Sequence, residues 1–243
     1  MDSKFVRGLK NLVSRSQFTI KLFRPIYHAT LKRFQIANTK KNFRKNACSV
    51  LHSFHQCMED NGCFYTLAFG SLLGAIREKG FIKHDLDIDV YMWAEDYDLS
   101  LPDKLRKYGF RLAHDFMVGD GKLGREQTFE KNGVGIDIFY VYPPIGELPY
   151  CCDFIFVKDC TSFVDQMKKY GGVVCRRLEL PFEKERIVTK FEDFDIYIPK
   201  NAHELLRFRY GDDYMIPNPQ WTSGKKNEHI IVWEGNLGKY TEY

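Results

Sequence analysis

The sequence predicts an α+β fold in which a mixed sheet is flanked by helices and preceded by a basic helical arm. Three observations support this prediction: a helical apolar pattern from Ala47, short β-rich segments that alternate with helices after it, and a concentration of basic residues before it. The chain has 243 residues, of which 44% are apolar and 28% charged. This composition suits one ordinary globular core and excludes an intrinsically disordered chain.

The first 45 residues are strongly basic. They contain twelve Lys and Arg and one acid, a net charge of +11 within a chain whose total is +4. Apolar residues recur among them at helical spacing, at Phe5, Leu9, Leu12, Val13, Leu22, Phe23, Ile26 and Tyr27. We expect an amphipathic arm over residues 1–46 that makes peripheral contact with anionic lipid through residues 1–45. A solvated helix folded onto the domain, or a partner-binding surface, fits the same pattern.

Composition also bears on compartment and partners. No segment approaches the roughly 18 consecutive apolar residues of a membrane span, and the basic start lacks the apolar run of a signal peptide. Seven cysteines, an odd number, suit buried thiols in a reducing compartment. We therefore expect a cytoplasmic protein, peripheral on the inner membrane face if the arm binds lipid. The small net charge indicates no nucleic-acid partner.

The rest of the chain, residues 47–243, is expected to be one catalytic domain. A helix begins at Ala47 and ends near Gly62, with Ala47, Val50, Leu51, Phe54, Cys57 and Met58 on one face. Later elements follow from local apolar runs and turn residues. They are a strand over 63–68, a helix over 72–78, a strand over 86–91, a helix over 102–108, strands over 127–130 and 134–142, a hairpin over 186–190 and 194–198, and a helix over 201–210.

The most informative segment carries three carboxylates at alternate positions, Asp85, Asp87 and Asp89. Because side chains alternate along a strand, the three acids are expected on one face and Leu86 in the core on the other. Clustered like charges repel and are costly unless a cation lies among them, and oxygen-only ligands suit Mg²⁺ or Mn²⁺. The alternative is an edge strand with a solvated acidic face.

Two further features favour an active site over a solvated face. Asp137 lies between two isoleucines in a strongly apolar strand, where a lone carboxylate needs a partner or a metal. Gly70-Ser71 joins a strand to a helix, where backbone N–H groups can hold phosphate oxygens. The order strand, Gly-Ser, helix, Asp-x-Asp and a later Asp is the minimal active site of the nucleotidyltransferase fold. Its carboxylates hold divalent ions that align an attacking and a leaving oxygen.

The same residues carry a closer resemblance. Residues 69–82 (FGSLLGAIREKGFI), followed by 85–89 (DLDID), resemble the signature of the LicD family, which includes the fukutin-type transferases. That signature reads approximately G-[ST]-L-L-G-x-x-R-x-x-G-F-I-P-W-D-D-D-I-D. Residues 135–139 (GIDIF) match its third-carboxylate strand, and residues 205–215 resemble its C-terminal helix and Y-G-x-x-[WY]-M element. Lys83, His84 and Leu86 depart from the signature's Pro, Trp and Asp.

The resemblance covers about residues 47–220 and implies a Mg²⁺-dependent phosphotransferase. Such an enzyme moves phosphocholine or an alditol phosphate from a CDP-activated donor to a hydroxyl of a cell-surface, capsular or lipid-linked glycan. It assigns the metal to Asp87, Asp89 and Asp137, and the donor phosphates to Gly70, Ser71 and Arg77. Asp85 is expected to support the metal ligands or to assist the acceptor as a base. Lys83 and His84 are further candidates for substrate contact, although a solvated loop also explains His84.

Two other interpretations stay open. One is a nucleotidyltransferase acting on a sugar phosphate or small molecule, which needs the same three acids. The other is a non-catalytic membrane-associated binding protein, against which the retention of a costly acidic cluster argues.

Two other residue sets are candidate ligand sites. Cys151, Cys152, Cys160 and Cys175 lack C-x-x-C spacing and have apolar neighbours, so zinc is not expected. Tyr140, Tyr142, Tyr150 and Trp221 are candidates to line a box for a choline-type cation, although core packing explains most of the 15% aromatic content.

Overall fold

A computed structural model describes residues 17–157, 159–218 and 229–243, with side chains from residue 37 onward. The chain divides into two compact units, Met1–Asn42 and Phe43–Tyr243. Helix α2 (Gln17–Asp60) contributes to both, and the predicted boundary near residue 46 falls inside it. The apolar set between Phe5 and Tyr27 lies outside the residues whose side chains are described, so the amphipathic arm stays a prediction.

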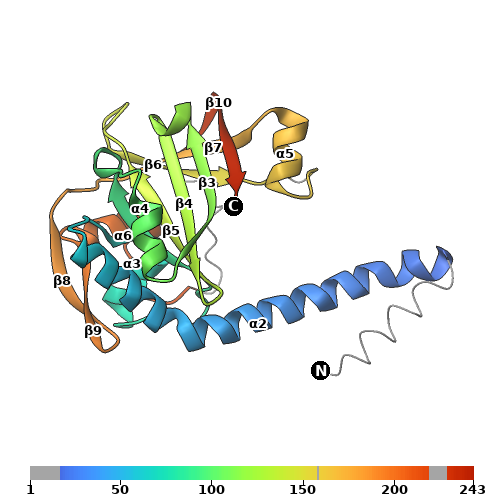
Figure 1. Ribbon diagram of the computed structural model, residues 1–243, viewed down its shortest axis with the longest axis horizontal. Coiled ribbons are helices and arrows are strands. Elements are labelled where there is room, and N and C mark those ends of the chain that lie inside the picture. Colours follow the sequence, from blue (N-terminus) through green and yellow to red (C-terminus); the bar gives the residue numbers. More distant parts are fainter. Residues whose placement is uncertain (1–16, 158, 219–228) are drawn as a thin grey trace. The chain divides into compact units, whose positions relative to one another are not determined.

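The second unit is built on a mixed sheet of eight strands (Figure 1). Their order across the sheet is β1 (Thr66–Leu67), β2 (Ile88–Trp93), β5 (Val134–Val141), β4 (Gly124–Lys131), β3 (Arg111–Val118), β10 (Ile230–Glu242), β7 (Val173–Glu179) and β6 (Tyr150–Ile155). Strands β2 and β5 are parallel, and the other neighbours are antiparallel. The predicted α+β class with a mixed sheet is confirmed.

The sheet curls so that its last strand, β6, returns to β4 and β5. Tyr142 and Tyr150 exchange backbone hydrogen bonds of 2.7 and 3.2 Å, and the Tyr150 hydroxyl donates to the Leu123 carbonyl at 2.9 Å. Gly124 permits this approach, because a Cβ there would lie 2.4 Å from Cys152 Sγ. The curl therefore brings β6, the last strand in the order, close to β4 and β5 in its first half.

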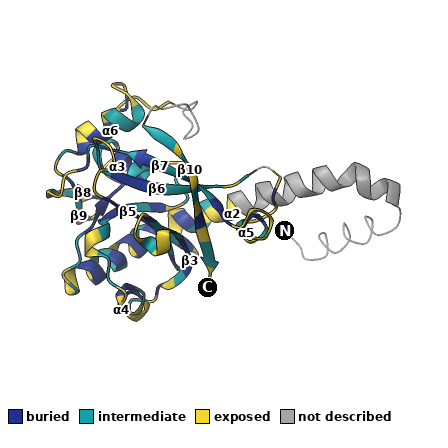
Figure 2. Cartoon of the chain, turned by 90° about the horizontal axis from the view of Figure 1, so that it is seen from above, coloured by how far each residue is buried: buried dark blue, intermediate teal, exposed yellow. Residues whose placement is uncertain are grey.

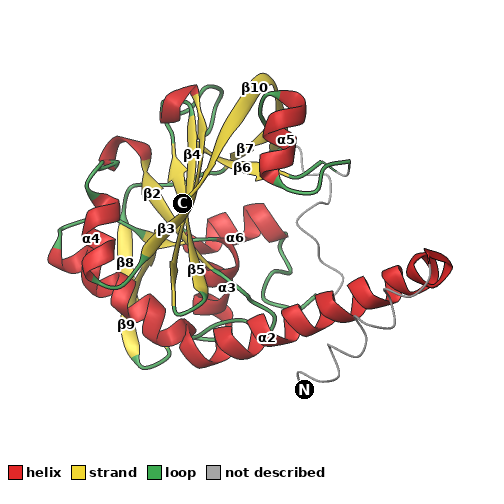
Figure 3. Ribbon diagram, turned by 45° about the vertical axis from the view of Figure 1, so that its right-hand side comes forward, coloured by secondary structure: helices red, strands yellow, loops and turns green. Residues whose placement is uncertain are grey.

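Four shorter α-helices and a hairpin complete the described part of this unit (Figure 3). The helices are α3 (Phe69–Arg77), α4 (Leu101–Lys107), α5 (Phe163–Tyr170) and α6 (Ala202–Tyr210), and the hairpin is β8 (Arg186–Phe191) with β9 (Phe194–Pro199). The hairpin lies beside α2, where Phe194 packs edge-on against His52 with ring centroids 5.1 Å apart. Helix α5 begins at Ser162, whose side chain accepts from the Asp165 amide, and ends at Gly171 in the left-handed conformation.

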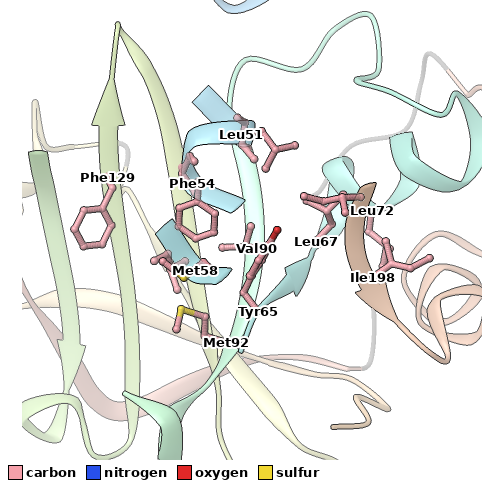
Figure 4. Packing of buried hydrophobic residues seen from close by; sticks show 14 of the residues in the cluster. Leu51, Phe54, Met58, Tyr65, Leu67, Leu72, Val90, Met92, Phe129 and Ile198 are labelled. Atoms are coloured by element: carbon pink, nitrogen blue, oxygen red, sulfur yellow. The ribbon is translucent and has the colours of Figure 1, made fainter. Parts of the chain in front are cut away.

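The core occupies both faces of β2 and β5. On one face, Phe54 and Met58 of α2 lie near Val90, Met92 and Phe129 of the sheet (Figure 4). The predicted apolar face of this helix is buried in full, which confirms that prediction. On the other face, a second cluster contains Tyr91, Phe139, Leu178 and Leu205. Buried positions follow the strands and the sheet-facing sides of the helices (Figure 2).

Two predicted strands begin later than expected. The strand predicted over 63–68 is β1, which starts at Thr66. The second is β2. Instead of starting at Leu86, β2 starts at Ile88, because Asp85 closes a turn. Its amide donates to the Ile82 carbonyl at 3.0 Å, and its Oδ2 accepts from the Ile82 amide at 3.2 Å. The residues before Ile88 therefore do not alternate as in a strand. The prediction that Leu86 points into the core is wrong, since Leu86 lines an open cavity.

Several elements have no counterpart in the sequence prediction: β3, β6, β7, β10 and α5. In β3, the buried Asp115 interrupts the apolar pattern that marks a strand. Arg125 and Gln127 of the neighbouring strand bind its carboxylate at 3.1 Å. In β10, the register shifts between Val232 and Leu237, around Gly235 with a positive φ. β3 pairs with the adjacent β4 and with the distant β10, and both partners of β10 are distant in sequence.

Phe54→Ala is expected to lower the free energy of unfolding by about 3–5 kcal/mol, because it opens a cavity between α2 and the sheet. Urea denaturation followed by circular dichroism measures this change. Lys45→Ala, at an exposed position of the same helix, is the control and should change stability by under about 0.5 kcal/mol. Equal losses for the two variants would contradict the assigned packing.

Candidate active site

The parallel pairing of β2 with β5 sets Asp89 directly opposite Asp137. Paired positions on neighbouring strands project to the same face of a sheet, so the two carboxylates are neighbours. The residues on either side of them, Val90 and Ile138 among others, point into the core on the opposite face. The third predicted acid, Asp87, precedes β2 by one residue and reaches solvent.

The start of helix α3 adjoins these acids. The Asp89 amide donates to Ser71 Oγ at 3.0 Å, and the Asp89 carbonyl accepts from the Ala68 amide at 2.9 Å. The Gly70 amide donates to the Asp89 carboxylate. A Cβ at Gly70 would lie 3.4 Å from Asp85 Oδ1 and 3.8 Å from Asp89 Oδ2. Ser71 is thus buried and ties β2 to α3, and its assignment to donor phosphates stays a prediction.

Backbone strain lies next to this contact. Phe69 has φ of +39°, a left-handed conformation that is unfavourable for a residue with a large side chain. Its ring packs edge-on against Tyr91 and Phe139, with centroid distances of 5.2 and 4.8 Å. The Arg209 guanidinium lies 5.5 Å from the same ring. These contacts hold the strained residue in place, and the next amide, that of Gly70, is thereby directed at Asp89.

A second glycine explains how the loop before Asp85 reaches the site. A Cβ at Gly74 would lie only 2.4 Å from the Gly80 carbonyl oxygen and 3.4 Å from the Ile82 amide. Only glycine lets the loop lie directly on α3. The spacing of Gly70 and Gly74 in the motif therefore serves two close approaches, one to the carboxylates and one to the loop.

Burial and mutual repulsion perturb the acids strongly. Burial raises the pKa of Asp89 well above its ordinary value, and the charges of Asp87, Asp137 and Asp85 raise it further, against the opposing Gly70 hydrogen bond. Asp87 reaches solvent on one side, but its partial desolvation within the cluster also raises its pKa.

The two flanking acids shift in the same direction. Burial raises the pKa of Asp137 to about 6, although the Thr128 hydroxyl, which donates to its Oδ1 at 2.5 Å, opposes the rise. Burial likewise raises the pKa of Asp85 to about 6, against the Ile82 amide and the Arg77 charge. Without a bound cation, the cluster therefore holds protons close to neutral pH.

The donor chemistry of these four acids fits a hard divalent cation such as Mg²⁺ or Mn²⁺. A cation between them would also relieve the repulsion that raises their pKa values. Within residues 37–157, 159–218 and 229–243, no three Asp, Glu, His or Cys side chains are already arranged to hold an ion. Binding would therefore require rotation of the carboxylates, with Asp87, Asp89 and Asp137 the best-placed ligands.

Two cavities adjoin the acids. The first, which we call the Arg77 pocket, has a volume of about 590 Å³ and is lined by Gly70, Arg77, His84, Asp85 and Tyr210 among others. The second, the Glu126 pocket, has a volume of about 340 Å³ and is lined by Asp87, Glu126, Thr128 and Asp137 together with aromatic rings. Asp85 opens on the first pocket and Asp87 and Asp137 on the second, so the acidic cluster lies between them.

The three basic residues predicted to contact substrate, Arg77, Lys83 and His84, differ in burial and in their position relative to the pockets. Arg77 lines its pocket with a side chain only 12% exposed, and it donates to Glu78 at 3.0 Å and to the Tyr214 carbonyl at 3.3 Å. His84 is exposed and lines the same pocket. Lys83 is exposed in the adjoining turn and lines neither of the two pockets.

Glu126 and Thr128 are site residues that the sequence analysis missed. They occupy alternate positions of β4, and Thr128 pairs directly with Asp137. The hairpin turn at Asn132-Gly133 fixes this register, so counting back from the turn would have placed both beside Asp137.

The cysteines and tyrosines considered as ligand sites have other positions. Cys151 and Cys152 are buried, reduced and divided between two core clusters, as expected for adjacent strand residues. Cys160 and Cys175 are also buried free thiols. Tyr140, Tyr142 and Tyr150 belong to the core and line neither pocket, and Trp221 lies outside the described residues.

Residues 62–169 match the family described as "LicD/FKTN/FKRP, nucleotidyltransferase domain". The resemblance predicted from the motif is confirmed.

Curated relatives agree with this match. The mouse (Mus musculus) protein "Ribitol-5-phosphate transferase FKTN" is 26% identical over 184 residues, which are 74% of this chain and 35% of the relative. The Haemophilus influenzae protein "Lipopolysaccharide cholinephosphotransferase LicD" is 38% identical over 74 residues, which are 29% of this chain and 28% of the relative. The chain therefore matches only about a third of the length of these relatives.

The pKa shifts predict a stability that depends on pH and on Mg²⁺. An acid with an ordinary pKa of 3.8 and a folded-state pKa of about 6 binds more protons in the folded state, so its contribution to stability falls as pH rises from about 4 to about 6. Mg²⁺ bound by the same acids would compete with those protons. At about 100 times its dissociation constant, Mg²⁺ should raise the melting temperature by about 5 °C at pH 7.5 and by under about 1 °C at pH 4.5.

Differential scanning fluorimetry measures these shifts. The Asp89→Asn variant removes a central ligand and should lose the Mg²⁺-dependent rise at pH 7.5. A rise of equal size in this variant would place the ion elsewhere.

Proposed function

We propose that this chain, of which residues 62–169 match the family described as LicD/FKTN/FKRP nucleotidyltransferase domain, is a Mg²⁺-dependent phosphotransferase. It transfers a phosphorylated small group from a CDP-activated donor to a hydroxyl of a glycan. The observation that carries the proposal is the pair Asp89 and Asp137, side by side on parallel strands, with the Gly70 amide directed at one of them. This arrangement concentrates oxygen ligands and backbone donors at one point beside two pockets.

The acids have the role of holding the cation. Asp87, Asp89 and Asp137 would bind Mg²⁺, which neutralises the charge of a pyrophosphate and of the leaving CMP. Thr128 keeps Asp137 oriented through its hydroxyl, and Ser71 keeps Asp89 at the start of β2. The Asp85 carboxylate is held by the Ile82 amide at the edge of the Arg77 pocket, where it can accept a proton from a bound hydroxyl.

In the proposed reaction, the acceptor oxygen attacks the distal phosphorus of the donor pyrophosphate. A new phosphorus–oxygen bond forms to the glycan, and the bond to the bridging oxygen breaks, so that CMP leaves with both electrons of that bond. The hydroxyl proton passes to a nearby carboxylate or to solvent. Arg77 supports the negative charge from within its pocket, since its guanidinium is held by Glu78 and the Tyr214 carbonyl.

The relatives support transfer of a substituted phosphate and differ in the group they move. One printed activity concerns ribitol 5-phosphate and the other choline phosphate. Phosphocholine and an alditol phosphate are therefore the two donor groups that we propose, with a cell-surface, capsular or lipid-linked glycan as acceptor. The biological role that follows is polysaccharide biosynthesis.

We also propose that the protein works in the cytoplasm, in peripheral contact with the inner membrane face through residues 1–45. Twelve basic side chains in this segment suit anionic headgroups. Among the residues that the structure describes, no helix is long and apolar enough to cross a membrane.

The chemistry is tested by measuring CMP release from CDP-choline, CDP-ribitol, CDP-glycerol and CDP-ethanolamine with a pooled glycan acceptor. We expect Mg²⁺-dependent release from one donor, and a loss of at least about a hundredfold in Asp89→Asn. Asp195→Asn, which changes only an exposed ion pair with Lys190, is the control and should keep full activity.

Two outcomes would contradict this proposal. Nucleotide attached to an acceptor, without free CMP, would indicate nucleotidyl transfer. Equal release by Asp89→Asn and the wild-type protein would remove the acidic cluster from the reaction.

The membrane contact is tested by sedimentation with vesicles containing phosphatidylserine. Replacing the exposed Lys41, Arg44 and Lys45 with Gln removes three charges, each worth about 1 kcal/mol near an anionic surface, and should weaken binding about a hundredfold. The matched control replaces the exposed Lys107, Lys122 and Lys168 with Gln. Similar losses in the two triple variants would show that net charge alone, rather than the arm, drives the contact.

A further inference from the structure

The Glu126 pocket has an aromatic wall assembled from four distant elements. The ring of Phe116, on β3, stacks on Phe154 of β6 with centroids 4.8 Å apart and planes 14° apart. Phe163 of α5 meets Phe116 edge-on at 5.0 Å, and Tyr240 of β10 lies 4.8 Å from it. A Cβ at Gly238 would lie 2.4 Å from the Phe154 ring, so a glycine on β10 makes room for this ring.

The Glu126 carboxylate, which has no hydrogen-bond or ion-pair partner among the described residues, faces this wall. Glu126 lies on β4 two residues before Thr128, and strand alternation puts both on the face that carries Asp137. In the part of the chain that the structure describes, no hydrogen bond or ion pair to the Glu126 carboxylate is found. The nearby Asp153, in contrast, pairs with Arg176 at 2.9 Å. Glu126 is desolvated among further acids, which is costly unless a ligand compensates it.

We propose that the Glu126 pocket binds an alkylammonium headgroup, of the quaternary type found in choline, and holds it beside the acidic cluster. Ring faces attract such a cation through their quadrupoles, and the carboxylate supplies the opposite charge. A quaternary ammonium needs no hydrogen-bond partner, which suits a wall made of Phe116, Phe154, Phe163 and Tyr240. A polyol would need several hydrogen-bond partners, of which these four rings supply only the Tyr240 hydroxyl.

The position of the pocket gives the headgroup a place in the reaction. Asp87 and Asp137 line the same cavity as Glu126, so a phosphate joined to the headgroup by a short chain reaches the acids while the cation stays among the rings. The Arg77 pocket on the other side of the cluster remains open for the rest of the donor or for the acceptor. In this form the inference rests on the proposed function and selects a phosphoalkylammonium ester as the transferred group.

The test measures binding of tetramethylammonium and of phosphocholine to the full chain by isothermal titration calorimetry. Glu126→Gln and Phe163→Leu should each weaken both ligands about tenfold. The controls are Glu130→Gln, on the same strand but ion-paired with Arg111, and Phe208→Leu, a ring on α6 outside the pocket lining. They should change affinity less than twofold. Melting temperatures of all four variants establish that each is folded.

Two results would overturn the inference: unchanged affinity in both pocket variants, or a larger loss for ribitol 5-phosphate than for phosphocholine.

The tetramethylammonium measurement separates this inference from the proposed function, because it requires no turnover. Glu126-dependent binding of tetramethylammonium in a protein that releases CMP from none of the four donors would support the pocket and refute the phosphotransferase. Release of CMP from CDP-ribitol alone, together with no binding of tetramethylammonium, would support the phosphotransferase and refute the pocket.

Discussion

The juxtaposition of Asp89 and Asp137 on neighbouring parallel strands is the constraint around which the site is built. Two buried carboxylates repel, and each must be compensated from nearby. The Gly70 amide and the Thr128 hydroxyl supply this compensation, one to each acid. The strain at Phe69 follows from the same requirement, since a left-handed residue directs the next amide at Asp89. A divalent cation would neutralise the negative charge that these two protein groups compensate only in part.

Contacts on the opposite face of the sheet fix the register of the strands around Asp89 and Asp137. Arg125 binds Asp115 through two hydrogen bonds of 3.1 Å, Gln127 donates to the same carboxylate, and the Tyr140 hydroxyl donates to Gln127 at 2.8 Å. These contacts cross-link β3, β4 and β5 within a buried region, where breaking a polar pair is costly. A slip of one residue would turn Thr128 away from Asp137 and bury the wrong face. The buried polar network therefore keeps Thr128 beside Asp137, although it contacts neither residue.

The curl of the sheet decides what else surrounds the acids. Because β6 returns toward β4, and β10 lies between β3 and β7, rings from β3, β6, β10 and α5 meet in one cavity beside Asp137. The Arg77 pocket forms separately, from α3, the loop before β2 and the segment after α6. The acidic cluster thus has chemically different surroundings on its two sides: Arg77 and His84 among mixed polar and apolar residues on one, and aromatic rings with Glu126 on the other. Such a division suits a transferase that must keep two substrates apart.

The sequence by itself determined the local elements: the buried face of α2 from Ala47 to Met58, the Gly70-Ser71 junction, and the three acids that the structure brings together. Apolar periodicity and glycine spacing are local properties, so each of these could be inferred from a few neighbouring residues. Only the tertiary structure decided the turn that Asp85 closes, the position of Leu86 in the Glu126 pocket, the structural use of the Ser71 hydroxyl, and the aromatic rings that gather beside Glu126. These depend on strand order and curl, because pairing between segments far apart in the chain leaves no mark on the composition of either segment.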